Sequence, residues 1–176
     1  MIETERLWCE PVTAAHADAM FPVLSDRRIY TYLPEQPPSS VDALRERYGF
    51  LSLGKSPDGA ESWLNWILRL RSTRVPIGFY QATVRPAHCS IAYVLDPEHW
   101  RKGYATEASN AILTHLFETY RMAAVTVESS VRNEASVALV KRLGFSFVRH
   151  DAAESDDIYE ITRSAWIARR GAVGAR

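Results

Sequence analysis

The stretch that most constrains the fold runs from Ile91 to Ala108 and reads IAYVLDPEHWRKGYATEA. It predicts a strand, then a short basic loop that contains a glycine, then a helix. This order presents backbone N–H groups and two cations, Arg101 and Lys102, at the start of the helix. The first turn of a helix has N–H groups without intrahelical partners and carries the positive end of the helix dipole. The stretch therefore predicts a phosphate-binding site.

The end of the predicted strand, Asp96-Pro97, adds a second indication. Proline cannot donate a hydrogen bond to a neighbouring strand, so pairing should stop there. Free backbone groups would then lie beside the phosphate site, where an extended ligand that contains amides could use both. The loop has neither a Walker pattern nor Gly-x-Gly-x-x-Gly. Taken alone, it is equally typical of an ordinary strand-to-helix turn with solvated cations.

Composition excludes several classes of protein. A chain of 176 residues fits one domain with a substantial core, and 47% apolar with 24% charged residues is ordinary for a soluble domain. The 21 basic and 21 acidic residues cancel, which argues against a dedicated nucleic-acid binder. The two cysteines, Cys9 and Cys89, lack metal-ligand spacing, so we expect no metal and no disulfide framework.

The expected location follows from two further features. The N-terminal residues are charged and polar, unlike a signal peptide, and no apolar run is long enough to span a membrane. We therefore expect a cytoplasmic protein that does not associate with membranes. Exposed sheet edges would be compatible with a homodimer.

Hydrophobic patterns along the chain predict alternating helices and strands. Strands are expected at residues 6–13, 63–71, 77–84, 89–95, 123–129, 145–150 and 157–162, and helices at 14–26, 41–52, 104–119 and 134–143. Short turns join the second, third and fourth of these strands, which makes them antiparallel neighbours. We expect a single domain over residues 1–168 and a loose tail over 169–176.

A second motif occupies residues 133–145. Asn133 is a good N-cap and Gly144 a good helix terminator, so helix ends explain most of it. Ser136 is different, because the helical spacing puts it on the same face as Leu139 and Leu143. A hydroxyl on a buried face either caps locally or meets a ligand. The residues alone favour the cap.

Together the two motifs resemble the GNAT superfamily of N-acetyltransferases, and within it the branch of the ribosomal-protein N-terminal acetyltransferases. The resemblance is carried by residues 93–108 and by Asn133-x-x-Ser136 followed by Leu143-Gly144-Phe145, with a matching element order over about residues 4–165. It implies an α/β (α+β) fold. That fold has a mixed, mostly antiparallel sheet of six to seven strands with a V-shaped splay, flanked by about four helices.

The resemblance also implies the ligand, acetyl-coenzyme A as cosubstrate, in a gap between the strands at 89–95 and 123–129. Pantetheine amides would pair with the backbone of Val94 and Leu95. Asn133 and Ser136 would lie near the pantetheine and the sulfur. The pyrophosphate would rest on the loop and helix start formed by Arg101, Lys102, Gly103, Tyr104, Ala105 and Thr106.

Departures from the family pattern affect the catalytic residues. Many relatives carry a tyrosine acid seven positions after the asparagine, where this chain has Val140, so Ser136 becomes the candidate general acid. A glutamate common in this branch is replaced by Ser90. The base is then sought among other residues, with Glu98 named first and His88, His99 and Glu128 as alternatives.

The chemistry predicted is acetyl transfer to a primary amine, of a small molecule or a protein N-terminus, by direct attack in a ternary complex. The acceptor pocket is expected from residues 28–37, 61–66 and 150–157, with Tyr32, Trp63 and Trp66 as walls beside Tyr30. Two alternatives remain open. One is a non-catalytic acyl-coenzyme A-binding module or sensor, and the other is a different phosphate ligand, such as a nucleotide, at the same loop.

Overall fold

A computed structural model describes residues 1–86 and 88–174. Its centre is an eight-stranded sheet in the order β1-β2-β3-β4-β5-β6-β8-β7. Every neighbouring pair is antiparallel except β5 and β6, which run parallel. This confirms the mixed, mostly antiparallel sheet. The strands are β1 (Ile2–Glu3), β2 (Leu7–Pro11), β3 (Ser62–Leu70), β4 (Pro76–Arg85), β5 (His88–Leu95), β6 (Ala124–Ser130), β7 (Ser146–Asp151) and β8 (Asp156–Thr162).

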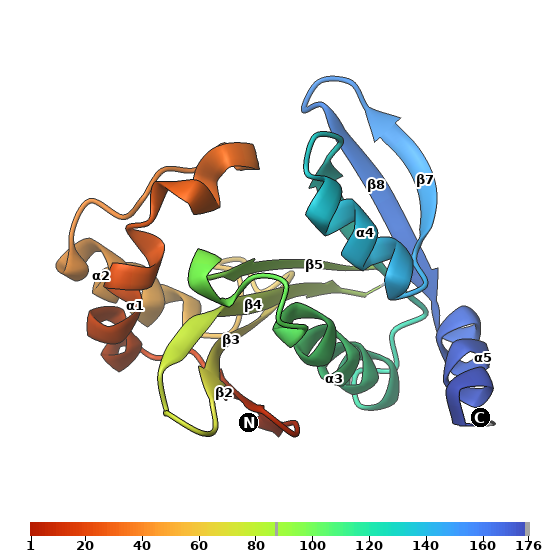
Figure 1. The fold of residues 1–176 in the computed structure, drawn as a ribbon, viewed down its shortest axis with the longest axis horizontal. Helices are drawn as coiled ribbons and strands as arrows, with labels where there is room; N and C mark the ends of the chain where they lie inside the picture. The colour runs from red at the N-terminus through yellow and green to blue at the C-terminus, as the bar shows by residue number, and fades with distance from the viewer. Residues whose placement is uncertain (87, 175–176) are drawn as a thin grey trace.

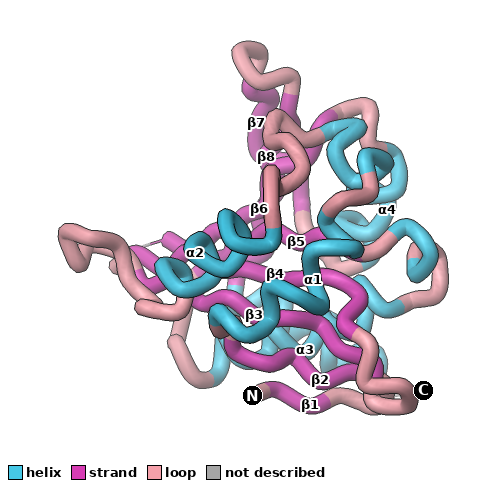
Figure 2. Tube along the Cα trace, turned by 90° about the vertical axis from the view of Figure 1, so that its left-hand side faces the viewer, coloured by secondary structure: helices cyan, strands magenta, loops and turns pink. Residues whose placement is uncertain are grey.

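Helices cover both faces of the sheet. They are α1 (Ala17–Leu24), α2 (Val41–Leu51), α3 (Tyr104–Glu118), α4 (Glu134–Arg142) and α5 (Arg163–Gly174), with short 3-10 turns η1 (Ala14–His16), η2 (Arg27–Tyr32) and η3 (Pro97–His99). Figure 2 shows α1 and α2 on one face of the sheet and α3 on the other. Within the described ranges, none of these helices combines the length and apolarity needed to cross a membrane.

Two apolar cores follow from this arrangement, one on each face. The smaller core joins α1 and α2 to the sheet and includes Met20, Leu44 and Ile67. The larger core joins α3, α4 and α5 to the opposite face and includes Ile112 and Leu143. Alternation along each strand divides its side chains between the two cores, since successive residues point to opposite faces.

The sheet opens between its two parallel strands. β5 and β6 share only two register pairs, Ser90 with Thr126 and Ile91 with Val127. β4 and β5, in contrast, stay in register to Leu95. Beyond Ile91, therefore, the edge of β5 that faces β6 is unpaired. In Figure 1, α4 and the β7–β8 hairpin stand on one side of this opening and α1 and α2 on the other.

Pairing ends at different places on the two edges of β5. On the β4 side it extends to Asp96, whose N–H donates to the carbonyl of Ile77 at 2.8 Å. On the β6 side it stops at Ile91. The prediction that Asp96-Pro97 ends the pairing thus holds for the first edge alone. Divergence of the two parallel strands, rather than proline, frees the second edge.

Gly78 on β4 lets the two strands approach closely at this point. Its φ is +153°, and a Cβ built on it would lie 2.1 Å from the carbonyl oxygen of Val94. No larger residue fits without moving β5, because that oxygen belongs to the backbone. Nearby, the register of β3 against β4 shifts between Leu68 and Arg69.

Two elements differ from the sequence prediction. The strand β1 is only two residues long, too short for alternation to reveal. The chain from Arg169, expected to be loose, continues α5 as far as Gly174. Trp166 explains this, because it is 2% exposed and stacks on Phe117 at 6.0 Å, while Arg169 donates to Asn110 at 3.3 Å. Residues 175–176 of the predicted tail lie outside the described residues.

Candidate active site

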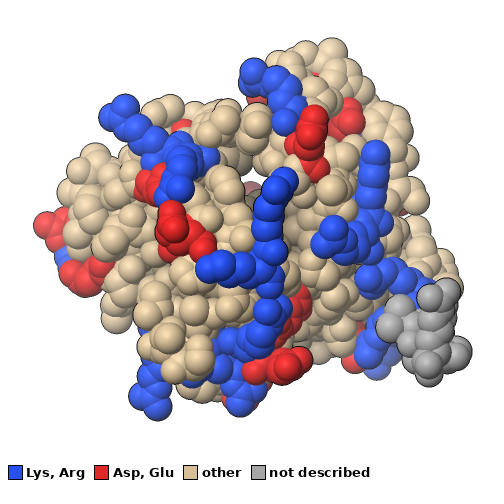
Figure 3. Space-filling model, viewed as in Figure 1, with Lys and Arg blue, Asp and Glu red and all other residues tan. Residues whose placement is uncertain are grey.

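The loop before α3 has the geometry of an anion site. Gly103 is the N-cap with φ +83° and makes no side-chain cap hydrogen bond, and Arg101 also has a positive φ of +59°. These two left-handed residues curl the backbone, so that N–H groups converge as in other anion-binding loops. No N–H of residues 101–106 donates to another residue in the described ranges. Basic side chains gather near the centre of the face shown in Figure 3.

Arg6 braces this loop from the turn between β1 and β2. Its guanidinium donates to the carbonyl of Lys102 at 3.0 Å and to the carboxylate of Glu107 at 2.6 Å, and lies 4.5 Å above the ring of Tyr104. The hydroxyl of Thr4 also donates to Glu107, at 2.6 Å. Burial acts to raise the pKa of Glu107, but these hydrogen bonds hold that pKa below its ordinary value. Glu107 therefore anchors the loop to the N-terminal strands.

The free edge of β5 offers backbone groups from Tyr93 and Leu95. Antiparallel strands alternate residues that bond across the pair with residues that face away. Since the N–H of Asp96 bonds to β4, the same alternation turns Val94 toward β4 and its neighbours toward the opening. Leu95 thus fits the predicted pairing with pantetheine. The prediction for Val94 does not fit, because its backbone groups face β4.

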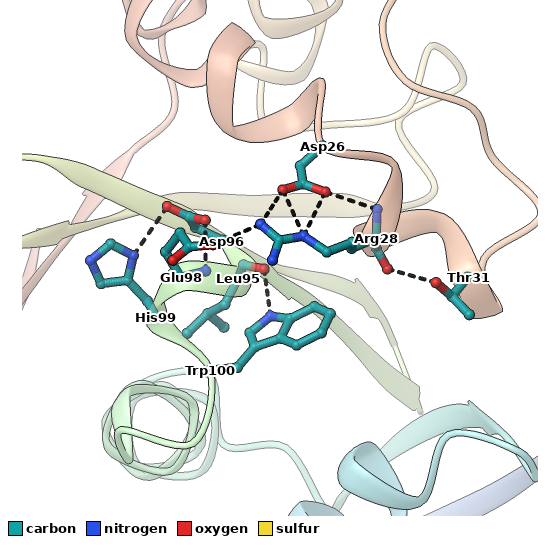
Figure 4. Close-up of polar contacts among 8 residues, drawn as sticks. All are labelled: Asp26, Arg28, Thr31, Leu95, Asp96, Glu98, His99 and Trp100. Carbon is teal, nitrogen blue, oxygen red and sulfur yellow. Dashed lines mark hydrogen bonds and ion pairs between the residues drawn. The ribbon is translucent and has the colours of Figure 1, made fainter.

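Trp100 occupies one group on this edge. Its indole N–H donates to the carbonyl of Leu95 at 2.8 Å (Figure 4). The groups that remain available to a ligand are the N–H of Leu95 and both backbone groups of Tyr93. A chain of ligand amides can bond to such a set, so this edge fits the pantetheine arm of coenzyme A.

Across the opening, Tyr93 meets Ser136. The two hydroxyl oxygens lie 2.9 Å apart. Burial raises the pKa of Tyr93, and the hydrogen bond between its hydroxyl and that of Ser136 opposes that rise without cancelling it, so the phenol stays protonated at neutral pH. Sequence analysis missed Tyr93 because its partner is 43 positions away. Alternation of side chains along residues 89–95 could have shown only on which face of the sheet Tyr93 lies.

Ser136 has a hydroxyl free for this contact because Asn133 caps the helix. The Asn133 side chain accepts from the N–H of Ser136 at 3.1 Å, which confirms the predicted N-cap. The helix ends as predicted at Gly144, whose φ is +91°. Phe145 N–H donates to Val140 and Gly144 N–H to Lys141, the Schellman pattern. The hydroxyl of Ser136 therefore contacts Tyr93 instead of capping the helix.

Glu98, the first candidate for the general base, is engaged in an ion pair. Arg28 donates to Glu98 at 2.8 Å and to Asp26 at 2.6 Å (Figure 4). The Glu98 side chain is 69% exposed. Its carboxylate is already occupied by the Arg28 guanidinium. The ion pair connects η2 with η3, and we call it the Arg28–Glu98 bridge.

The other base candidates have different surroundings. His99 lies 3.1 Å from a carboxylate oxygen of Asp96 (Figure 4), and His88 lies 3.2 Å from the hydroxyl of Thr126. Glu128 is exposed on β6. The structure therefore brings none of the three into contact with Tyr93 or Ser136 in the part of the chain it describes.

The predicted acceptor walls are dispersed. Tyr32 is 41% exposed at the end of η2, and Trp63 packs edge-on against Phe50 with its N–H on Glu61. Trp66 is 5% exposed and meets His115 of α3 edge-on, so it belongs to the larger core. Of these three, Trp66 alone lines the cavity described next, with Tyr30. The expected 150–157 turn contributes no lining residue.

That cavity has a volume of about 330 Å³ and lies between α2, the segment after η2 and the sheet face of β3, β4 and β5. Its lining includes Leu33, Leu44, Tyr48, Asn65, Phe79 and Val94. Residues of the predicted segment 28–37 line this cavity together with α2, which the sequence did not indicate.

Neither cysteine is suited to nucleophilic catalysis. Cys89 and Cys9 are both 0% exposed, and burial raises the pKa of each thiol to about 12. The thiolate is the nucleophilic form, so both are inert at neutral pH. This agrees with the prediction that Cys89 is a core residue.

An open strand edge beside a helix start with free N–H groups can accommodate an extended ligand that carries both amides and a phosphate. Residues 6–146 match the family model described as an acetyltransferase (GNAT) domain. The chain therefore belongs to the GNAT acetyltransferase family and is an acetyl-coenzyme A-dependent acyltransferase.

Similar proteins agree with this assignment. The uncharacterized N-acetyltransferase YoaA of Bacillus subtilis is 26% identical over 149 residues, which cover 82% of each chain. RimL, a ribosomal-protein alpha-N-acetyltransferase solved with coenzyme A, superposes with a TM-score of 0.80 at 18% identity over 92% of this chain and 97% of that one. Spermidine N-acetyltransferase from Vibrio cholerae, solved with coenzyme A and spermine, gives 0.76 at 20% identity over 93% and 99%. At these identities the two structures establish the fold.

Proposed function

We propose that this protein transfers the acetyl group of acetyl-coenzyme A to a primary amine by direct attack in a ternary complex. The observation that carries the proposal is the Tyr93–Ser136 contact across the open edge of β5. It supports the proposal because the two hydroxyls lie beside the edge along which we propose that the thioester binds. Acetyl-coenzyme A supplies the acetyl group as a thioester, and the residues bind, orient and move protons.

Binding is divided between two backbone surfaces. The N–H groups of residues 101–106, with Arg101 and Lys102, hold the pyrophosphate, because fixed N–H dipoles and cations favour an anion there. Tyr93 and Leu95 hold the amides of the pantetheine arm along β5. Asn133 and Ser136 mark the sulfur end. Holding the thioester in place should supply most of the rate, because positioning replaces a bimolecular encounter.

Ser136 acts as the general acid, supported by Tyr93. As the amine nitrogen bonds to the acetyl carbon and the carbon–sulfur bond breaks, the sulfur takes a proton from Ser136. Tyr93 then returns a proton to Ser136 through their 2.9 Å contact and regains one from water, which balances the proton that the product nitrogen releases. A thiol has a pKa of about 8.5, so protonation helps moderately at neutral pH. The surplus proton on the product nitrogen passes to water, and no acyl-enzyme is formed because the buried cysteines are inert.

The acceptor is an amine, either a protein N-terminus or a small molecule. Two structural neighbours, by their names, act on a ribosomal protein and on spermidine. Both acceptors present a primary amine. The amine must arrive unprotonated, since a protonated amine has no lone pair for attack.

Calorimetric titration tests the cofactor first. We expect acetyl-coenzyme A and desulfo-coenzyme A to bind and ATP to bind much more weakly, because ATP lacks the pantetheine arm. A panel of amines is then assayed for release of the free thiol. Absent binding, or equal binding of ATP, would contradict the proposal. Binding without turnover on a broad amine panel would instead indicate a non-catalytic binding module.

A further inference from the structure

The cavity under α2 has walls that are apolar and almost free of charge. Leu44, Ile67 and Phe79 form part of its interior surface. Among its lining residues, only Glu35 and Arg47 carry a formal charge, and both are exposed. Their charges are opposite, so the lining has no net excess. A volume of about 330 Å³ lies at the small end of the range for ligand pockets.

Three lining residues carry a buried polar group without a hydrogen-bond partner among the described residues; Tyr80 belongs to the larger core on the other face, which leaves Tyr48 and Asn65. The hydroxyl of Tyr48 and the side-chain nitrogen of Asn65 are buried, and neither has a hydrogen-bond partner among the described residues. Tyr48 itself is 4% exposed. A buried polar group without a partner is costly, so groups of this kind in a native structure call for an explanation. Because both side chains line the cavity, a ligand that enters it can bond to them.

The cavity adjoins the open edge of β5. Ala92, Tyr93 and Val94 form one of its walls. The same strand leaves its β6-facing edge unpaired beyond Ile91. A body held in the cavity therefore lies against the strand along which the pantetheine arm is proposed to run.

We propose that the acceptor is a primary amine on a bulky apolar body with one hydrogen-bonding oxygen, as in the α-amino amide of a large apolar residue. The apolar body fills the cavity, and the amide oxygen accepts from Tyr48 and Asn65. The proposal rests on the acetyltransferase function given above. Both a free amino-acid amide and the first residue of a peptide carry this chemistry.

The charge of the walls argues against a polyamine. Each ammonium group removed from water needs a compensating carboxylate, and Glu35 is the one carboxylate in the lining. The ion pair between Glu98 and Arg28 also favours an α-amine, because Glu98 is then not free to act as a base for the acceptor. An α-amine has a pKa of about 8, against about 10 for a lysine-like amine, so a larger share is unprotonated without help from a base.

The test compares phenylalanine amide with phenethylamine, which has the same apolar body and amine but no amide oxygen. Thiol release from acetyl-coenzyme A and ligand-observed NMR binding are measured for both, and for spermidine. We expect phenylalanine amide to have the lowest KM. A tetrapeptide that begins with phenylalanine, run in parallel, distinguishes a peptide acceptor from a small molecule.

Tyr48→Phe is the decisive variant, because it removes the unpartnered hydroxyl and keeps the ring. It should raise the KM for phenylalanine amide about tenfold, leave phenethylamine unchanged, and not lower the melting temperature. As a blocking pair, Ala43→Trp adds bulk to a lining position of α2, whereas Glu46→Trp adds the same bulk to an exposed position outside the lining. Only Ala43→Trp should impair the binding and acetylation of phenylalanine amide.

Three results would overturn the proposal. They are a preference for spermidine, an equal effect of Tyr48→Phe on both aromatic amines, and phenylalanine amide that is neither bound nor acetylated. In each, tight binding of acetyl-coenzyme A would leave the proposed acetyltransferase function standing. Failure of acetyl-coenzyme A to bind would remove that function itself.

Discussion

The proposed cofactor side and the proposed acceptor side of this molecule are built from different kinds of groups: backbone on the first and side chains on the second. The cofactor side consists of backbone: the N–H groups at the start of α3 and the free edge of β5. The acceptor side consists of side chains from α2, the segment after η2 and one sheet face. The positions of backbone groups depend on φ, ψ and strand register, so a fixed backbone geometry suits a carrier molecule that does not vary. Side-chain surfaces can change residue by residue without altering the fold, which suits a variable acceptor.

The largest effect should come from breaking the backbone side at Gly78. Gly78→Ala places a Cβ 2.1 Å from the carbonyl oxygen of Val94 and forces β5 to move. We expect a loss of about 3 kcal/mol of folding stability and a clear loss of acetyl-coenzyme A affinity. Chemical denaturation and calorimetry measure the two.

Gly49→Ala is the matched control, since an added Cβ there meets nothing within 4 Å. It lies inside α2 and should stabilise the protein by about 0.5–1 kcal/mol. If Gly78→Ala behaved like Gly49→Ala, the close approach of β4 and β5 would not be required.

The next effect concerns the proton donor. Ser136→Ala should lower kcat by one to two orders of magnitude, roughly the lower end of general-acid effects, and change the affinity for acetyl-coenzyme A little. Tyr93→Phe should lower kcat less, because Ser136 remains. Unchanged turnover in Ser136→Ala would rule out its role as acid.

The affinity for coenzyme A, compared with that for desulfo-coenzyme A, gives a second test of the roles of Tyr93 and Ser136. Both variants should weaken coenzyme A binding by a small factor and spare desulfo-coenzyme A, because only coenzyme A has the sulfur that the hydroxyls are proposed to meet. A purely structural effect would weaken both ligands alike.

A smaller effect on folding stability is expected when the pH is lowered. The folded-state pKa of Glu107 lies below its ordinary value of 4.5, so its stabilising contribution is present above about pH 4.5 and disappears as the pH falls through the depressed pKa. Melting temperatures from pH 6 to pH 3 should therefore drop less steeply in Glu107→Gln than in the parent. Glu46→Gln, at an exposed site of α2, should follow the parent curve.

The smallest effect is expected at the Arg28–Glu98 bridge. Glu98→Gln should change kcat by less than about threefold, because exposed ion pairs contribute little. Arg28→Gln should do the same. A loss of about a hundredfold or more in Glu98→Gln would restore Glu98 as the general base.

Much of the fold could be predicted from local patterns. The strand, basic loop and helix of residues 89–119 and the ends of α4 at Asn133 and Gly144 appear where the sequence indicated. Caps, glycine turns and alternation depend on residues a few positions apart, which a sequence displays directly. β1 escaped prediction because two residues show no period, and α5 because Trp166 stabilises it through a distant contact with Phe117.

The candidate site was predicted in part, for the same reason. Leu95 and the loop proposed to bind phosphate lie where the sequence indicated, whereas the backbone of Val94 faces β4, which could not be predicted because the register of β5 against β4 was unknown. The contribution of α2 to the cavity was also missed. Its lining gathers residues from positions 12 to 94, and no local pattern links them.

The sequence by itself therefore determined most of the elements, their order, the basic loop before α3 and the family. The tertiary structure decided which groups meet: Tyr93 with Ser136, Arg28 with Glu98, and Arg6 with Glu107. It also decided that β5 and β6 part after Ile91, which opens the site. The physical reason is one of range. Local structure follows from dihedral preferences and nearby hydrogen bonds, whereas contacts between residues 43 to 101 positions apart exist only once the sheet has fixed its register.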